Sequence, residues 1–344
     1  MKKQAECNPR LGKVGGGAML EGVMMRAADL CAIACRREDG TLVVREKRFT
    51  SLRQKHKFWN LPILRGIVSF IESLVLSYSC LAISAEVMGE AEEETKFEKS
   101  FKKHLGVRFF DVLMLLAGIL GVVLSLALFL ALPRLVAGWI ESLLGVTLGH
   151  WKSAVEGVLK ILIFLCYLLL VSLMKEIRRT FEYHGAEHKS IACYEAGDAL
   201  TPEAARKYSR FHPRCGTSFM FVMILLGVLL GFGVNALFPN LKTILYVLIR
   251  LALLPLVVGV GFEFIRYAGC HQNVLVRLLA APGLWMQRIT TREPDDAQLE
   301  VALLSLQYAL PEDFPELDRA AYRAAAETAA APKEAGENAP PTEE

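Results

Sequence analysis

Long apolar runs alternate with charged segments along this chain of 344 residues. Four runs carry few or no charged residues, and they cover positions 111–132, 158–174, 219–238 and 243–265. A helix rises about 1.5 Å per residue and the hydrocarbon core of a bilayer is about 30 Å thick, so each run is long enough to cross it. The pattern therefore predicts a mainly α, polytopic membrane protein with about four spanning helices.

A fifth apolar segment, 61–87, contains Arg65 and Glu72 and has two interpretations, a further span or an interfacial or re-entrant helix. Thirteen Lys and Arg lie in residues 1–60 and eight in 175–217. Four spans place both basic regions on one face, which the positive-inside rule makes cytoplasmic. A fifth span would move the most basic region outside. We therefore predict an interfacial or re-entrant helix at 61–87 and a multi-pass protein of the plasma membrane with both termini in the cytoplasm.

The same pattern divides the chain into seven segments. They are an N-terminal β-containing segment (1–60), the interfacial helix and a charged linker (61–110), two spans (111–174), a cytoplasmic loop (175–218), two further spans (219–266), C-terminal cytoplasmic helices (267–318) and a disordered tail (319–344). In the first segment, 29–36 and 41–48 alternate as strands do and flank a turn ending at Gly40. The triplet Gly15-Gly16-Gly17 permits a close backbone approach, but it lacks the lysine of a phosphate-binding loop.

The C-terminal helices have recognisable boundaries. The stretch 274–289 reads as an interfacial helix, broken at Pro282-Gly283. Asp295 is suited to cap the next helix, with Gln298 three positions later as its capping-box partner. That helix should dock its apolar stripe on another cytoplasmic element. Beyond about residue 330 we expect disorder.

The run Tyr183-His184-Gly185-Ala186-Glu187-His188 carries the candidate chemistry. Histidines four apart share a helix face, so both imidazoles can point at one metal ion. Glu187 completes the order H-x-x-E-H, the inverted zincin pattern, in which the glutamate acts as the general base toward water. The run predicts a divalent metal site, with zinc the expected ion.

Two ligand sets remain open. Helices predicted at 178–195 and 201–211, the second capped by Thr201, bring His212 and Cys215 near the histidine pair. One set is His184 and His188 with Glu195 or His212, which leaves a position open for catalysis. The other is a closed structural set, made by His184, His188, His212 and Cys215.

Other polar residues have weaker assignments. Inverted zincins need a downstream glutamate, and Glu263 is the candidate near a span end. Arg250 lies within the last apolar run but about 10 Å from its outer end, close enough to snorkel.

The eight cysteines are scattered, so free thiols or metal ligands are expected on the cytoplasmic side. A carrier is a third function class, and the few polar residues in the spans argue against it.

Four motifs together resemble the YqhQ-like family of uncharacterised bacterial membrane proteins, some of them labelled metal-dependent enzymes. They are GGGAMLEGVMMR (15–26), EYHGAEHKSIACYEAGDALT (182–201), HPRCGTSF (212–219) and TTREPDDAQLEVAL (290–303). The resemblance implies a multi-pass membrane protein and supplies no substrate. The motif residues it singles out beyond the candidate ligands are Glu21, Arg26, Glu187, Arg214, Thr291, Arg292 and Glu293.

Two functional hypotheses follow. The first is a metal-dependent hydrolase at the membrane surface, in which Glu187 is the general base and Arg214 or Arg292 stabilises developing negative charge. The second is a non-enzymatic scaffold or assembly factor with a structural metal site. Expected partners are the lipid bilayer and its anionic headgroups, with no nucleic acid, and a homo-oligomer or another membrane protein stays open.

Overall fold

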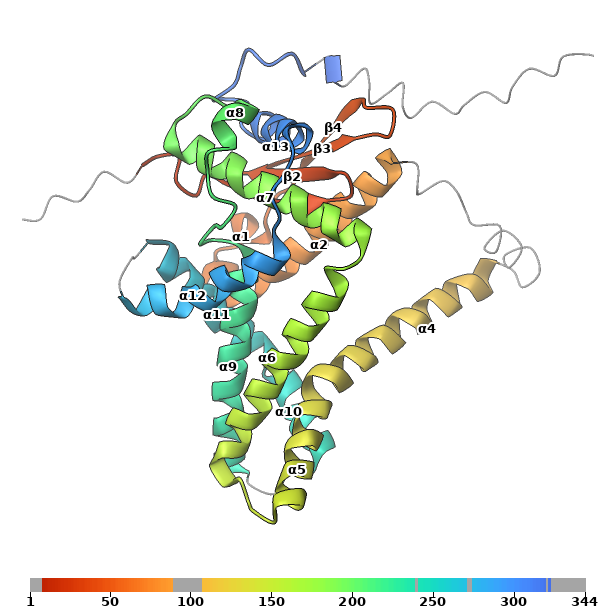
Figure 1. The fold of residues 1–344 in the computed structure, drawn as a ribbon, viewed down its shortest axis with the longest axis vertical. Helices are drawn as coiled ribbons and strands as arrows, with labels where there is room; N and C mark the ends of the chain where they lie inside the picture. Colours follow the sequence, from red (N-terminus) through yellow and green to blue (C-terminus); the bar gives the residue numbers. More distant parts are fainter. Residues whose placement is uncertain (1–7, 89–106, 239–240, 271–273, 320, 323–344) are drawn as a thin grey trace, which may run out of the picture.

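The computed structural model describes residues 8–88, 107–238, 241–270, 274–319 and 321–322. Its N-terminal part is a four-stranded antiparallel sheet in the order β1-β2-β3-β4 (Figure 1). The strands are β1 (Val14–Met19), β2 (Gly22–Ala27), β3 (Leu30–Arg36) and β4 (Leu42–Arg48). The last two match the predicted strands. The first two were not predicted, because the glycine triplet in β1 is unfavourable for strands in isolation. The predicted tail beyond about residue 330 lies outside the described residues.

Helices cover both faces of this sheet (Figure 1). On one face, α7 (Lys175–Ala196) and α13 (Asp296–Ala309) form a buried core with β2 and β3. On the other, α2 (Leu64–Val87) packs its Leu76, Cys80 and Val87 against Cys31 and Ile33 of β3. Side chains alternate between faces along a strand, so β3 contributes to both cores. The sheet is thus sandwiched between helices from opposite ends of the chain.

The capping of α13 is as predicted. Asp295 accepts a hydrogen bond from the Gln298 backbone, and the Gln298 side chain accepts one from the Asp295 backbone. Leu299, Ala302 and Leu306 are buried against the sheet and α7. The predicted cytoplasmic docking helix therefore forms the second layer of the sheet domain.

The predicted helix 201–211 is wrong in its extent. Thr201 caps it as expected, but the helix, α8 (Pro202–Ala205), ends after one turn. In the segment that follows, backbone carbonyl groups accept hydrogen bonds from a side chain of α7 instead. Lys189 Nζ donates to the carbonyls of Arg206 (3.0 Å) and Tyr208 (2.9 Å). Tertiary hydrogen bonds thus replace those that a longer helix would have made.

Below the sheet domain lies a bundle of long apolar helices (Figure 1). The first predicted span is α4 (Val107–Leu126), which continues through a π-helical turn, η2 (Ala127–Ala131), into α5 (Leu132–Leu144). The second and third are α6 (Lys152–Val171) and α9 (Gly216–Leu237). A short 3-10 turn, η3 (Gly149–Trp151), precedes α6. The bundle helices are therefore close to the predicted runs, although the first is longer.

The fourth predicted span is divided. It forms α10 (Thr243–Ala252) and α11 (Leu254–Cys270), bent by 47° where they meet. Helix α2 also has the length and hydropathy of a span. Among the described residues, four single helices therefore meet that test, with the bent pair as a fifth candidate. Helix α2 crosses α11 where Gly66 faces Gly259, and a Cβ on Gly66 would lie 3.0 Å from the Gly259 Cα. The small residues let the two backbones touch.

Two further predictions need correction. Helix α12 (Val274–Thr290) passes through Pro282 without the predicted break. A proline removes one helical hydrogen bond, and packing against α9 keeps the helix continuous here. Arg250 does not snorkel, since its residue is only 7% exposed. It donates to Tyr246 Oη (2.8 Å) and lies 3.8 Å from Glu156, which also pairs with Arg134 (3.2 Å).

A candidate metal centre

Helix α7 supplies the backbone of the site. It runs from Lys175 to Ala196 and ends at Gly197, whose φ of 84° is the left-handed conformation that stops many helices. Its C-terminal half, residues 183–194, is buried at almost every position between the sheet, α13 and the 206–214 segment. Polar side chains in this half therefore face other protein groups rather than water, and three of them are His184, Glu187 and His188.

Cys215 joins the histidine pair from another element. One ligand atom from each of His184, His188 and Cys215 lies within 4.8 Å of the other two. The Cys215 Sγ is 3.3 Å from the His184 Nε2, and the two imidazole rings are 4.5 Å apart between centroids. Ligands of a tetrahedral zinc site are roughly 3.5 Å apart, given bonds of about 2.0 to 2.3 Å. The three groups thus form a candidate site for a metal ion.

Both histidines are oriented for ligation through the same nitrogen. The His184 Nδ1 donates to the Thr290 carbonyl (2.8 Å), and the His188 Nδ1 donates to the Arg210 carbonyl (2.5 Å). These hydrogen bonds fix the tautomer and leave each Nε2 with a free lone pair, as at most protein metal sites. Burial lowers the pKa of His188, which favours the neutral form that binds metals.

A close backbone contact explains why α7 has a glycine at position 185. A Cβ on Gly185 would lie 2.0 Å from the carbonyl oxygen of Arg292, so only glycine fits under that segment. The Arg292 amide donates to the Phe181 carbonyl (2.8 Å). The 290–292 segment therefore lies directly on α7 and presents the Thr290 carbonyl to His184.

Glu187 lies beside the three candidate ligands. Its Oε2 is 4.0 Å from the His184 Nε2, and its side chain is 7% exposed. It rests on β1, where a Cβ on Gly16 would lie 2.8 Å from the Glu187 Cγ. Burial raises the pKa of Glu187, while the nearby His184 and His212 oppose that rise. A carboxylate with a raised pKa next to the site has the properties of a general base.

His212 lies near the triad but belongs to a neighbouring polar cluster. Its ring is 5.5 Å from that of His188, and its Nε2 is 3.8 Å from Glu195. Gln287 of α12, fully buried, accepts from the His212 amide and donates to the His212 carbonyl, both at 2.8 Å. These two hydrogen bonds thus fix the backbone of His212.

Glu195 is committed to other partners. It pairs with Arg214 and accepts from the Gly12 amide (2.8 Å). Burial alone would raise the pKa of Glu195, but hydrogen bonds from His212, Gly12 and Arg214 outweigh it and lower the pKa to about 2. Glu263, the candidate downstream ligand, pairs with Arg65 of α2. Neither carboxylate is brought to the triad.

The remaining motif residues have defined contacts outside the triad. Glu21, in the β1–β2 turn at φ 43°, accepts from Arg179 (2.5 Å) and Tyr183 (3.1 Å). Thr291 is fully buried, and its carbonyl accepts from Arg210 (2.6 Å). The Arg292 Nε is buried with no hydrogen-bond partner among the described residues. Arg26 lies apart from the triad, in a pocket that it lines together with residues of α1 (Leu52–Lys55).

Sequence reasoning missed the residues that support the ligands. Gln287 is one, and Lys189 is another: it is 4% exposed and pairs with Glu293 at 2.9 Å. A lysine inside the H-G-A-E-H-K run was a usable signal, because lysines are seldom buried without a partner. Gln287, far away in an apolar helix, gave no comparable signal.

Comparison with known proteins places these features in a family. The family model described as protein of unknown function (DUF1385) matches residues 61–312, which include all three triad residues. The chain belongs to this family. It is similar to the uncharacterized protein YqhQ of Bacillus subtilis (strain 168), at 34% identity over 303 residues, 86% of this chain and 92% of the relative. The predicted resemblance is confirmed. No solved structure matches the chain.

Proposed function

We propose that this chain is a membrane metalloprotein with a cytoplasm-facing zinc site at His184, His188 and Cys215. The observation that carries the proposal is the convergence of these three ligand atoms, two of them from imidazoles whose other nitrogen is bound to a backbone carbonyl. Membrane placement is supported by the long apolar helices and by the basic residues gathered on the side of the sheet domain.

We further propose hydrolytic chemistry at this centre. Three protein ligands leave a fourth position for water or substrate, and a bound zinc ion would supply Lewis acidity there. Glu187, 4.0 Å from the His184 Nε2, is placed to take a proton as general base. Arg292, whose Nε has no hydrogen-bond partner among the described residues, is the candidate for stabilising negative charge. Arg214 is less suited, because Glu195 already neutralises it.

A structural role for the metal is the second candidate. It is favoured by the position of Cys215, which caps α9 through the Thr217 amide (3.5 Å) while contacting His184 of α7. A metal there would join the sheet domain to the helical bundle. His212, 5.5 Å from His188 between ring centroids, is the residue available to close such a site.

Metal analysis of the purified full-length protein tests the centre itself. We expect about one zinc per chain, lost in His184→Ala with His188→Ala and in Cys215→Ser. The matched controls are His56→Ala, an exposed histidine, and Cys166→Ser, an exposed cysteine, and both should retain the metal. Wild-type protein without stoichiometric metal contradicts the proposal, as does retention by the ligand variants.

Cobalt substitution separates the two candidate functions without a known substrate. An open site should bind added azide or acetohydroxamate and change its visible spectrum, whereas a site closed by His212 should not. Glu187→Gln should retain the metal in both cases. A spectrum that is insensitive to added ligands, but becomes sensitive in His212→Ala, would identify the structural role.

A further inference from the structure

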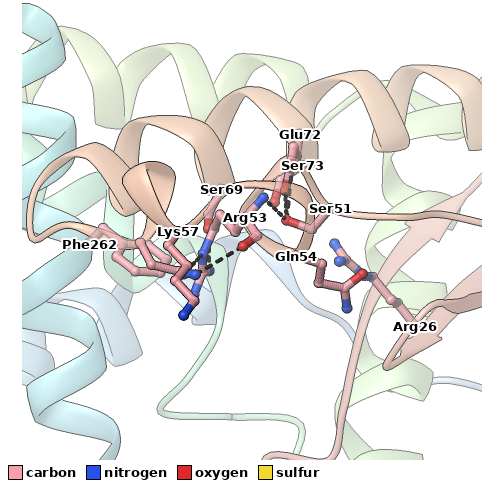
Figure 2. Close-up of a pocket in the computed structure, with 10 residues that line it drawn as sticks. Arg26, Ser51, Arg53, Gln54, Lys57, Ser69, Glu72, Ser73 and Phe262 are labelled. Carbon is pink, nitrogen blue, oxygen red and sulfur yellow. Dashed lines mark hydrogen bonds between the residues drawn. The ribbon is translucent and has the colours of Figure 1, made fainter.

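A second candidate site lies away from the metal centre, where the sheet meets the helical bundle. It is a pocket of about 650 Å³ between β2, helix α2 and two short elements, α1 (Leu52–Lys55) and η1 (Lys57–Asn60). Figure 2 shows Arg26 reaching into it from the strand, with Arg53 and Lys57 on the facing wall and Phe262 of α11 at one end. None of these residues takes part in the metal centre.

The lining of this pocket is cationic. Arg26, Arg53 and Lys57 carry three positive charges, and Glu72 carries the one negative charge. Glu72 is 8% exposed, and its carboxylate accepts from the Ser51 hydroxyl (2.9 Å) and the Leu52 amide (2.7 Å). Its charge is therefore already used in holding α1 in place. The lining therefore has a net charge of +2, from three cations and one carboxylate, and favours an anionic ligand.

The two arginines are held in position without being neutralised. The Arg26 guanidinium lies over the Phe49 ring at 4.6 Å, and neither Arg26 nor Lys57 forms an ion pair within the described residues. Arg53 donates to the Asn60 side chain (3.1 Å) and to the Ser69 hydroxyl (2.8 Å). Neutral partners and an aromatic ring orient a guanidinium while leaving its charge available to an anion.

The surroundings of the pocket are apolar. Exposed apolar side chains lie on the short elements that line it: Leu52 of α1 is 47% exposed, Phe58 of η1 is 61% exposed, and Leu61, directly after η1, is 49% exposed. A ligand with an anionic end and hydrocarbon chains could place its charge among the cations and its chains against the exposed apolar side chains of α1 and η1. This arrangement matches the cytoplasmic headgroup level of a bilayer, where basic side chains bind acidic lipids.

We propose that this pocket binds a phosphate group, and the exposed apolar side chains of α1 and η1 point to an anionic phospholipid as its carrier. Guanidinium groups bind phosphate oxygens through paired N–H donors, and the Lys57 ammonium adds a point charge. The pocket also contains hydroxyl and amide groups, from Ser69, Ser73 and Gln54, that can donate to phosphate oxygens. This site does not depend on the proposed metal centre.

The test uses purified, delipidated full-length protein in detergent, with lipid binding measured by native mass spectrometry. The probes are phosphatidic acid, phosphatidylcholine and inorganic phosphate. The pocket variant is Arg26→Gln with Lys57→Gln. The control is Lys55→Gln with Lys207→Gln, which removes the same charge from exposed positions outside the pocket. We expect the pocket variant to bind phosphatidic acid about thirtyfold more weakly and the control within twofold of wild type.

The three probes assign the source of the phosphate. If millimolar inorganic phosphate displaces phosphatidic acid, the free anion is also a ligand of the pocket. If phosphatidic acid binds tightly and is not displaced, the lipid is the ligand. Equal binding of phosphatidic acid to the two double variants overturns the proposal, as does equal binding of phosphatidylcholine and phosphatidic acid to wild type. If the pocket variant is misfolded, Lys57→Gln alone should weaken binding about fivefold, since its exposed side chain supports no described contact.

Discussion

Gly185 of α7 and Arg292 touch so closely that a Cβ on the glycine would lie 2.0 Å from the arginine's carbonyl oxygen. The contact decides where the 290–292 segment runs, and that segment carries the Thr290 carbonyl to the His184 Nδ1. One glycine in the helix therefore controls the tautomer and direction of a candidate metal ligand.

Replacing Gly185 with alanine should disturb the metal centre. Alanine normally favours a helix by about 1 kcal/mol, but here the added methyl must displace backbone, which typically costs about 2 kcal/mol. We expect a lower unfolding temperature and weaker zinc retention, measured by differential scanning fluorimetry and metal analysis. The control is Gly216→Ala, at the start of α9, where an added Cβ meets open space. This variant should keep the unfolding temperature and the zinc content of wild type. A Gly185→Ala variant with the unfolding temperature and zinc content of wild type contradicts this contact.

Lys189 should be essential for the segment between α8 and α9. Its ammonium donates to the carbonyls of Arg206 and Tyr208 and pairs with Glu293. Removing a buried cation leaves these acceptors without a donor, so Lys189→Ala should cost about 3 kcal/mol in the free energy of unfolding. Limited proteolysis should show cleavage between 206 and 211 in this variant. The neighbouring, exposed Lys207→Ala should be cut no faster than wild type.

The ion pair between Arg65 and Glu263 should couple α2 to α11. Both side chains are partly buried, at 20% and 27% exposed, and the guanidinium binds the carboxylate through two nitrogens. Either charge reversal alone should lower stability by about 1 kcal/mol, and Arg65→Glu with Glu263→Arg should recover most of it. Thermal unfolding of wild type, the two single variants and the double variant gives the coupling free energy between the two side chains. The same cycle on the exposed pair Arg206 and Asp296 should give a smaller value, and equal values would argue against the α2–α11 coupling.

Asp313 should contribute to stability in a pH-dependent way. Hydrogen bonds from Tyr194 and Lys13 lower the pKa of Asp313 below its usual value in the folded chain. A depressed folded pKa stabilises the protein above the unfolded pKa, and this contribution is lost as pH falls through the folded pKa. Asp313→Asn should therefore be less stable than wild type at pH 6, with the difference disappearing toward pH 2. Unfolding midpoints across that range measure it, and a difference independent of pH would refute the assignment.

Local sequence patterns predicted the parts of the fold that depend on local physics. The apolar runs located the long helices, and Asp295 with Gln298 located the start of α13, because both signals act within a few residues. Strands β1 and β2 were missed, since Gly15, Gly16 and Gly17 have no strand preference and are held by pairing with β2 and by contact with Glu187. The early end of α8 likewise depends on Lys189, a contact across the fold.

The candidate site was predicted in a similar, partial way. Helical spacing brought His184, Glu187 and His188 together, because that geometry is set by the helix alone. His212 and Cys215 come from a loop, and only the structure shows Cys215 near His184. Glu195 lies on α7 itself, but the structure shows it paired with Arg214. Sequence spacing in a loop limits reach without fixing direction, so it could not separate those alternatives.

The sandwiched sheet has a consequence for biosynthesis. A ribosome completes the strands at Arg48, but α13, which covers one face, begins at Asp296, roughly 250 residues later. At about 5 to 20 residues per second, the part of that face covered by α13 waits roughly 10 to 50 seconds, while every long apolar helix is made. A chain that stops before α13 keeps Ala32, Ala34 and Val44 uncovered and offers them to chaperones and proteases. The sheet domain therefore completes its core only after the helical bundle has been synthesised.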